Sequence, residues 1–301
     1  MRHVGRPPQK VLLVAHTGRP AAVSTARRIA DRMLDAGVAM RLLASEAVAL
    51  DLPRADVVPD HSDLADGVDM VLVLGGDGTL LRGAEISRGT DASLLGVNLG
   101  HVGFLAEAEL DGVDSAVDRL LAGDYAVEER MTLDALVVRR DGRRELGWAL
   151  NDVSVEKPNR QKVLDCVVEV DARPLSRFGC DGVVLSTPTG STAYAFSCGG
   201  PVMWPDVQAL LLTPISAHAL FARPIVVAPT SHLAVEVSSP AVVWCDGRRT
   251  FDLEAGDRIE ATGGTTPVQL ARLSGLPFTD RLVRKFELPV QGWRGTARSG
   301  D

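Results

Sequence analysis

Short apolar runs in the first third of the chain predict strands that are buried on both faces. The runs occupy residues 11–15, 38–43, 71–74 and 94–97. They are too short for helices, and strands buried on both faces are typical of parallel sheets. The first two runs flank residues 20–37, whose apolar positions follow helical spacing. This order predicts a doubly wound α/β domain in the N-terminal part of the chain, with ligands at the carboxyl ends of its strands.

After residue 125 the pattern changes to short strands separated by turn signals. Residues 133–138 and 146–155 are expected to form a hairpin around a turn at 140–143. Further strands are expected at residues 163–170, 175–178, 183–186, 224–227, 233–237, 242–244 and 258–261. Residues 207–222 are expected to be part helix and part strand. The second domain is therefore predicted to be all-β.

Two further helices are expected outside this β-rich region. One covers residues 113–122 and ends at Gly123, and the other covers residues 279–288 with Thr279 as its cap. The second helix carries Leu282, Val283 and Phe286 on one face, so we expect it to return to the α/β domain. The expected domains are then residues 1–124 with 276–301, and residues 125–275.

Composition narrows the classes of function. The chain has 301 residues, 46% of them apolar, and a net charge of −7, which argues against nucleic-acid or acidic-membrane binding. Its four cysteines form no Cys-x-x-Cys pair and have no metal-ligand spacing. We find neither a signal peptide nor an apolar run long enough to cross a bilayer, so a cytoplasmic location is expected.

A glycine-rich turn follows the predicted strand at 71–74 and precedes a helical pattern. Gly75, Gly76, Asp77 and Gly78 form this turn. A glycine turn before a helix N-terminus favours phosphate binding, whereas a carboxylate within it would repel phosphate. Asp77 therefore either accepts a proton from an attacking hydroxyl, binds Mg²⁺, or simply shapes an Asp-Gly turn. The first two readings indicate phosphoryl transfer.

Two other stretches are candidates for binding nucleotide. Residues 185–194 hold five hydroxyl side chains around Pro188 and Gly190, a density that suits sugar and phosphate oxygens but is also common in polar loops. Asn151 and Asp152 at a strand end could bind an adenine edge and a ribose diol, or form an ordinary turn. Residues 98–104 contain two glycines and His101, and a plain turn is as good a reading there.

Two common nucleotide-binding motifs are absent from the sequence. There is no Gly-x4-Gly-Lys-Ser/Thr motif and no Gly-x-Gly-x-x-Gly fingerprint. The chain is therefore neither a P-loop enzyme nor an ordinary dinucleotide dehydrogenase.

Taken together, these stretches resemble the bacterial type of NAD kinase over nearly the whole chain. The matching motifs are LGGDGTLLRGAE, NLGHVGFLAE, ALNDVSVEK, DGVVLSTPTGSTAYAFSCGGP, TPISAHALFARPIV and the closing residues 290–293. GGDG alone also occurs in diacylglycerol- and sphingosine-type lipid kinases and in 6-phosphofructokinases. Its combination with the Pro-Thr-Gly-Ser-Thr-Ala-Tyr loop is specific to NAD kinases.

The resemblance implies a reaction, a fold and an assembly. The terminal phosphoryl of ATP, or of polyphosphate in some members, passes to the 2′-hydroxyl of the adenosine ribose of NAD and gives NADP. Mg²⁺ or another divalent cation is expected with the donor. The family fold has an N-terminal α/β domain and a C-terminal β domain, and the family forms homodimers or homotetramers.

The resemblance also assigns roles to residues. Asp77 matches the proton acceptor, Asn151 and Asp152 match the pair that holds the adenosine half of NAD, and Asp181 matches a dinucleotide contact that can come from a neighbouring subunit. The expected nucleotide-binding residues are Gly75, Gly76, Gly78, Thr79, Arg82, Asn151, Asp152, Lys162, Asp181, Thr189, Gly190, Ser191, Thr192, Ala193, Tyr194, Ala195, Phe196 and Ser197. The sequence departs from the family at Cys198, where a small neutral residue is usual, and at Arg248, where some members carry glutamine.

Two other functions compete with this one. A lipid kinase of the same superfamily would need an apolar entry groove and basic residues facing a membrane, and the net charge argues against it. A non-enzymatic NADP-sensing module would keep the dinucleotide loop without needing the carboxylate of Asp77.

Overall fold

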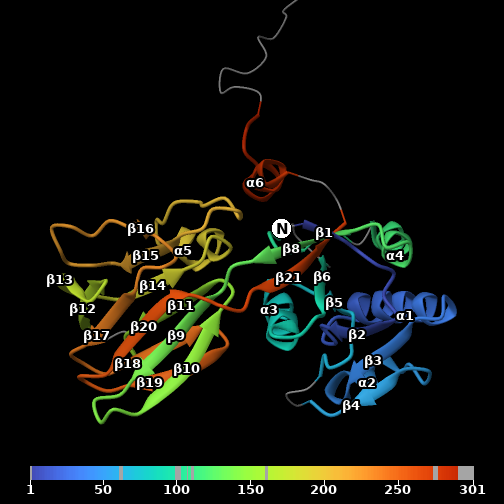
Figure 1. Ribbon diagram of the computed structural model, residues 1–301, viewed down its shortest axis with the longest axis horizontal. Coiled ribbons are helices and arrows are strands. Elements are labelled where there is room, and N and C mark those ends of the chain that lie inside the picture. The colour runs from blue at the N-terminus through green and yellow to red at the C-terminus, as the bar shows by residue number, and fades with distance from the viewer. Residues whose placement is uncertain are drawn as a thin grey trace, which may run out of the picture. The chain divides into compact units, whose positions relative to one another are not determined.

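The computed structural model describes residues 2–60, 64–98, 103–106, 108–109, 112–159, 162–273 and 277–290. The chain forms two compact units (Figure 1). Unit 1 contains Met1–Glu129 and Gln269–Asp301, and unit 2 is Arg130–Val268. Unit 2 is a few residues shorter at each end than the expected β domain of residues 125–275, because residues 126–130 and 268–272 form strands in the sheet of unit 1.

Unit 1 is built on a nine-stranded sheet in the order β1-β8-β21-β6-β5-β2-β3-β4, with β7 paired to β6. The strands from β21 to β4 in this order are parallel. The elements are β1 (Arg2–Val4), β2 (Lys10–Ala15), α1 (Pro20–Asp35), β3 (Ala39–Leu43), α2 (Ala44–Leu50), β4 (Asp56–Val58), β5 (Met70–Leu74), α3 (Asp77–Ser87), β6 (Ser93–Asn98), β7 (Ala108–Glu109), α4 (Val113–Leu121), β8 (Ala126–Arg130), β21 (Val268–Arg272) and α6 (Phe278–Phe286). The predicted doubly wound α/β fold is confirmed.

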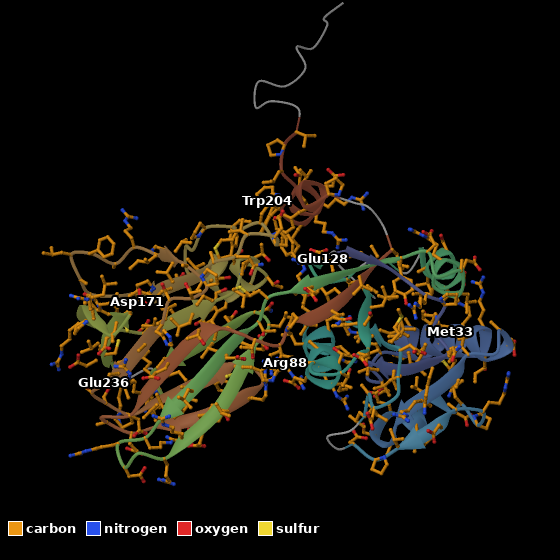
Figure 2. All side chains as sticks on the ribbon, in the orientation of Figure 1. Met33, Arg88, Glu128, Asp171, Trp204 and Glu236 are labelled. Carbon is orange, nitrogen blue, oxygen red and sulfur yellow. The ribbon has the colours of Figure 1, made fainter. Side chains whose placement is uncertain are left out.

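Helices cover both faces of this sheet. Alternate strand residues such as Leu13 and Leu72 share one core with α1 and α4, in which Met33 is fully buried (Figure 2). On the other face, Gly83 of α3 lies so close to Val73 that an added Cβ would be 2.4 Å from its methyl group. Because successive side chains on a strand point to opposite faces, strands covered on both sides read as continuous apolar runs.

Unit 2 contains two six-stranded antiparallel sheets, as the all-β prediction requires. Their orders are β10-β9-β20-β17-β12-β13 and β16-β15-β14-β11-β18-β19, and their facing residues share one apolar core. The strands are β9 (Leu133–Val138), β10 (Arg144–Ala149), β11 (Asp152–Glu156), β12 (Leu164–Val170), β13 (Arg173–Cys180), β14 (Gly182–Ser186), β15 (Leu210–Ile215), β16 (Ile225–Val227), β17 (Leu233–Val237), β18 (Ala241–Cys245), β19 (Arg249–Leu253) and β20 (Arg258–Gly263). The short helices η2 (Gly190–Thr192) and α5 (Tyr194–Ser197) follow β14.

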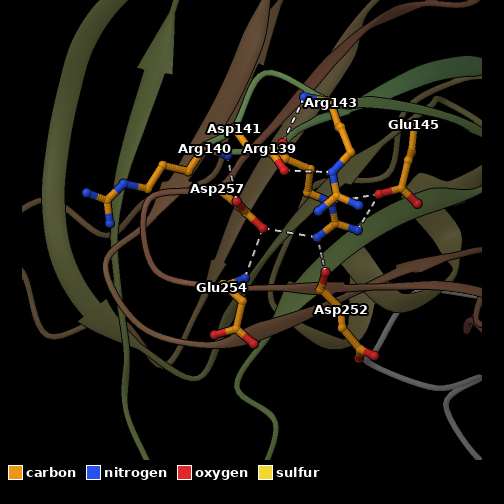
Figure 3. Close-up of polar contacts among 8 residues, drawn as sticks. All are labelled: Arg139, Arg140, Asp141, Arg143, Glu145, Asp252, Glu254 and Asp257. Carbon is orange, nitrogen blue, oxygen red and sulfur yellow. Dashed lines mark hydrogen bonds and ion pairs between the residues drawn. The ribbon is translucent and has the colours of Figure 1, made fainter.

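A polar cluster joins the two sheets at one end of unit 2 (Figure 3). The guanidinium of Arg139, next to β9, forms ion pairs with Glu145 on β10 and with Asp257 before β20. It also donates a hydrogen bond to the carbonyl of Asp252 on β19, in the other sheet. The Asp257 carboxylate accepts backbone N–H groups from Arg140 and Glu254, at 2.9 and 3.0 Å, so its buried charge is fully hydrogen-bonded.

Three expectations about elements are wrong. Residues 146–155 are not one strand: β10 ends at Ala149, and β11 starts at Asp152 in the other sheet. Residues 207–222 contain β15 but no helix. Thr279 lies inside α6 and does not cap it, since Pro277 is the N-cap residue.

Helix α6 contacts the segment after β6. The Phe104 ring lies 5.8 Å from the rings of both Phe278 and Phe286, and Arg281 Nη1 donates to the Ala106 carbonyl at 2.8 Å. These contacts reach a loop and not a strand, so the return of α6 to the α/β domain stays a prediction. Within the described ranges, none of the helices is both long and apolar enough to cross a bilayer.

Candidate functional site

The glycine-rich turn lies at the topological switch point of the sheet of unit 1, where the order in which successive strands are added reverses. From β2 the chain builds outward to β3 and β4, and from β5 it builds the other way to β6. Ligands of open α/β sheets bind beyond the carboxyl ends of the strands at such a switch point. The backbone N–H of His16, after β2, donates to the Leu74 carbonyl of β5 at 3.0 Å, which joins the two strand ends.

Helix α3 begins at Asp77, inside the glycine-rich turn that was expected to precede it. Gly76 is its N-cap, and the Gly76 carbonyl accepts the N–H groups of Thr79 and Leu80 at 3.0 and 3.1 Å. A Cβ on Gly75 would lie 2.5 Å from Thr79 Oγ1, so only glycine fits at this turn. Asp77 and Gly78 therefore occupy the first helical turn, where N–H groups without intrahelical partners favour an anion.

Asp77 has a carboxyl group that accepts protons more readily than usual. The residue is exposed, yet its carboxyl lies against Gly103, where an added Cβ would be 2.6 Å from Asp77 Oδ1. Burial of the carboxyl group raises its pKa, and the charge of Lys285 on α6 lowers it in part. A base near a phosphate-binding turn is the arrangement that proton transfer from a hydroxyl requires.

Arg82 lies on the same helix but binds protein carboxylates. Its Nη1 donates to Glu46 Oε1 at 2.8 Å and its Nη2 to Asp60 Oδ2 at 3.2 Å. The second oxygen of Glu46 accepts the N–H of Ala15 at 2.7 Å, at the carboxyl end of β2. Burial raises the pKa of the Glu46 carboxyl despite these bonds. Glu46 has no signal in the sequence, because helix α2 itself follows β3 directly and was not expected.

In unit 2, Asn151 and Asp152 lie where the chain crosses between sheets. The Asp246 carboxylate accepts the backbone N–H groups of Leu150, Asn151 and Asp152 at 2.9, 2.7 and 3.3 Å. Arg249 Nη2 also donates to it at 3.0 Å. Burial nevertheless raises the pKa of Asp246. Asp246 thus organises the Asn151–Asp152 pair, and it was missed because its own sequence reads as an Asp-Gly turn.

Most hydroxyls of the Ser/Thr-rich loop face inward, contrary to their expected use for ligand oxygens. Ser186, Thr187 and Ser191 are buried, and their hydroxyls donate to backbone carbonyls. Thr187 Oγ1 also accepts the N–H of Gly190 at 3.1 Å. A Cβ on Gly190 would lie 1.9 Å from the Asn151 carbonyl oxygen, so this glycine seats the loop on the Asn151–Asp152 pair. Thr189 and Thr192 are only half-buried.

The short helix α5 presents side chains to solvent. Tyr194, Phe196 and Ser197 are exposed, Ala193 is half-buried, and Ala195 is buried against Val184 of β14 and its neighbours. Asp152 is buried, and burial, Asp246 and Glu156 raise its pKa to about 7, while the Tyr194 backbone N–H lowers it. The expected pair and the expected loop are therefore in direct contact.

Four other residues singled out in the sequence lie on the surface of unit 2. Lys162 is exposed, and Asp181 forms an ion pair with Lys157 that lowers the pKa of Asp181. Arg248 is exposed in the turn between β18 and β19, and Cys198 is half-buried after α5. Residues 99–102, with His101, lie outside the described residues. Among the residues that are described, no three His, Cys, Asp or Glu side chains are grouped to hold a metal ion.

Comparison with known proteins gives one consistent family. Residues 11–125 match the family model of the ATP-NAD kinase N-terminal domain, and residues 150–273 match that of the ATP-NAD kinase C-terminal domain. NAD kinase 2 of Streptomyces coelicolor is 56% identical over 290 residues, covering 95% of this chain and 96% of that protein. The NAD kinase of Thermobifida fusca is 54% identical over 304 residues, covering 97% and 93%.

Solved structures agree on the fold. The chain is similar to yeast NADH kinase complexed with NADH, with a TM-score of 0.87, 22% identity and coverage of 97% of this chain and 91% of that one. It is also similar to an NAD kinase from Archaeoglobus fulgidus in complex with ATP, with a TM-score of 0.69, 23% identity and coverage of 92% and 98%.

Proposed function

This chain belongs to the NAD kinase family, and from that premise we propose how its own residues phosphorylate NAD with ATP. The proposed acceptor is the 2′-hydroxyl of the adenosine ribose, and the product is NADP. The lipid-kinase and NADP-sensing alternatives are set aside, because NAD kinase family models match segments of both units.

The observation that carries the proposal is the position of Asp77. Its carboxyl stands at the first residue of α3, beside a glycine turn that suits phosphate, and its raised pKa suits a proton acceptor. In the proposed reaction the ribose oxygen attacks the terminal phosphorus, the bond from that phosphorus to the bridging oxygen of ADP breaks, and Asp77 takes the hydroxyl proton. Most of the acceleration is expected from positioning and charge neutralisation.

We assign the acceptor nucleotide to residues of unit 2. Asn151 and Asp152 hold the adenosine half of NAD, and residues 192–197 form the dinucleotide loop that closes over it. Residues 189–191, Lys162 and Asp181 also contact the dinucleotide. Gly75, Gly76, Gly78 and Thr79 supply donor contacts. Arg82 acts mainly by fixing α3, since its guanidinium is bound to Glu46 and Asp60.

A divalent cation is proposed to enter with the donor. Mg²⁺ binds through phosphate oxygens with one or two carboxylates, and Asp77 is a carboxylate of this kind. Bound Mg²⁺ would neutralise charge on the transferring phosphate. We further propose that ATP is the phosphoryl donor. We also propose a cytoplasmic location and a homodimer or homotetramer.

The test is incubation with NAD, ATP and Mg²⁺, followed by an NADP-specific dehydrogenase as the readout and phosphorus NMR of the product. Asp77→Asn keeps the volume but cannot accept a proton, so kcat is expected to fall roughly 10²- to 10⁴-fold while NAD affinity hardly changes. Asp91→Asn, an exposed aspartate of the same unit, is the matched control and should keep wild-type activity.

Repeating the Asp77→Asn assay at high Mg²⁺ separates the roles of the carboxylate. Partial recovery would mean that Asp77 mainly binds the metal, whereas a missing base is not restored in this way. Full activity in the variant would leave Asp77 with a turn-shaping role only. A product phosphorylated at a position other than 2′ would contradict the proposed acceptor.

A further inference from the structure

The turn between β18 and β19 holds the chain where it crosses from one sheet of unit 2 to the other. Its first residue, Asp246, donates its backbone N–H to the Asp152 carbonyl at 2.9 Å. Its carboxylate accepts the three backbone N–H groups of residues 150–152. Asp246 has a φ of 54°, in the left-handed region that aspartate tolerates better than most side chains do. The turn therefore binds the backbone of the Asn151–Asp152 pair through both its main chain and its carboxylate.

The Asp246 carboxylate accepts these N–H groups in a place where an isolated charge is costly. Its side chain is only 1% exposed, whereas that of Arg249 is 29% exposed. Arg249 Nη2 donates to Asp246 Oδ2 at 3.0 Å, and the same oxygen accepts the Leu150 N–H. Burial raises the pKa of Asp246, and the charge of Arg249 opposes that rise. Removing the cation would leave a buried charge uncompensated, and a carboxylate that loses its charge is a weaker acceptor of N–H groups.

The Arg249 guanidinium is itself held by an aromatic ring. Its Cζ lies 4.4 Å from the centre of the Trp148 ring, which is a cation–π distance. Trp148 lies on β10, two residues before Leu150, whereas Arg249 lies on β19 in the other sheet. Trp148 is half-buried, so its ring shields the cation in part from solvent. Arg249 thus connects the two sheets next to the crossing that carries Asn151 and Asp152.

We propose that Arg249 is a positioning residue for the adenosine half of NAD, acting through Asp246 on the backbone of residues 151–152. The inference rests on the proposed function of that pair. With Arg249 in place the ionised carboxylate holds all three N–H groups, so the side chains of the pair start from a fixed backbone. A site that is ordered before its ligand arrives loses less conformational freedom on binding. The benefit therefore belongs to NAD binding and not to ATP binding.

The kinetic test uses Arg249→Met and Arg249→Lys. Methionine can still pack on the Trp148 ring but carries no charge, so it should raise KM for NAD roughly 5- to 30-fold, as for the loss of a hydrogen bond to a charged group. Lysine keeps the charge and should restore most of this loss. The values of kcat and of KM for ATP should hardly change in either variant. Arg144→Met, at an exposed position on β10, is the matched control and should keep the wild-type KM for NAD.

A double variant tests whether Arg249 acts through Asp246. Asp246→Asn removes the charge that Arg249 compensates and leaves one oxygen to accept N–H groups, so it should itself raise KM for NAD. In that background Arg249→Met should raise KM no further, because both changes remove one shared interaction. Two effects that simply add would show that Arg249 acts by another route, and the proposal would then be wrong.

An NMR measurement follows the backbone of the pair without any assay of activity. The chain has three asparagines, at positions 98, 151 and 159, so protein labelled with ¹⁵N at the backbone nitrogen of asparagine gives three amide signals. Asn151→Gln identifies the signal of Asn151, whose N–H donates to Asp246 Oδ1 at 2.7 Å. This signal should shift in Arg249→Met, because its acceptor loses the compensating cation, and should stay in place in Arg144→Met. An unmoved signal in Arg249→Met would overturn the link through Asp246.

The outcomes separate this inference from the function on which it rests. A wild-type protein that makes no NADP overturns the proposed function, while the NMR shift still decides the link from Arg249 to the pair. A wild-type protein that makes NADP, combined with an unchanged KM for NAD in Arg249→Met, overturns the positioning role. If Arg249→Met fails to fold, Arg249→Gln takes its place, since glutamine can still donate a hydrogen bond but carries no charge. An unchanged KM for NAD in that variant counts against the role.

Discussion

Asp152, which we propose to hold the adenosine half of NAD, also makes the stability of unit 2 depend on pH. Its folded pKa of about 7 lies above the ordinary value of 3.8 because it is buried next to Asp246 and Glu156. Between these two values the folded state holds the proton more tightly than the unfolded state. The stability that comes from protonated Asp152 is therefore complete below about pH 4 and is lost as the pH rises through 7.

Asp152→Asn cannot ionise and should escape this loss. We expect its free energy of unfolding, relative to wild type, to increase between pH 4.5 and pH 7.5 by up to about 3 kcal/mol. Urea unfolding at several pH values measures the difference, and Asp252→Asn, which changes an exposed aspartate of β19, is measured alongside as the control. A difference that stays constant with pH would show that Asp152 ionises normally.

At the residue scale, local sequence predicted Asp77 but not the residues that organise the site. Asp77 was singled out because the strand, the turn and the helix that place it are adjacent in the chain, so its setting can be recognised from local sequence. Asp246 and Glu46 act on residues about 95 and 31 positions away, and no local pattern records such pairings. The Ser/Thr-rich loop was selected for its hydroxyls, but most of these hydroxyls are buried and bound to backbone groups, because burial cannot be read from residue type alone.

At the element scale, the best predictions were strands that are apolar throughout and helices with a clear stripe. The strand expected at residues 233–237 matches β17 residue for residue. The break between β10 and β11 was missed because both halves have strand character, and the crossing is fixed by residues far along the chain, the Asp246 carboxylate and the Thr187 hydroxyl. Strands β8 and β21 were missed as members of the first sheet because strand pairing across more than 100 residues leaves no periodic signal.

Helix α6 is expected to contribute to the stability of unit 1. Leu282 is buried, whereas Val283 and Phe286 are only half-buried. Ending the chain at Pro277 should therefore lower the free energy of unfolding by roughly 2–5 kcal/mol, somewhat less than three fully buried side chains would give. Thermal and urea unfolding measure this. Leu288→Ala, which changes a side chain that is 46% exposed, is the control and should unfold like the wild type. Unchanged unfolding after truncation would mean that α6 does not pack on this unit.

At the scale of the whole molecule, exposed apolar side chains in unit 2 favour the proposed oligomer. Leu220 and Phe221 are 111% and 55% exposed, and Val226 on β16 is 51% exposed. Apolar side chains gathered on a surface often mark protein interfaces. We expect Leu220→Asp/Phe221→Asp to reduce the mass measured by light scattering to that of a smaller species. Val48→Asp, at a position 92% exposed in unit 1, should leave the mass unchanged. An oligomer that survives the double change would place the interface elsewhere.

The order of strands in unit 1 also determines when its sheet can be completed during synthesis on the ribosome. β21 lies between β8 and β6 in the sheet, although all of unit 2 is translated between β8 and β21. At about 5–20 residues per second, on the order of ten seconds pass between the synthesis of β8 and that of β21, the strand that joins β1 and β8 to the other strands of the sheet. Unit 2 is thus fully synthesised before β21 is. Throughout that interval the edge of β6 that will pair with β21 has no β21 beside it. Translation speed over residues 130–268 therefore sets how long that edge is exposed to other chains.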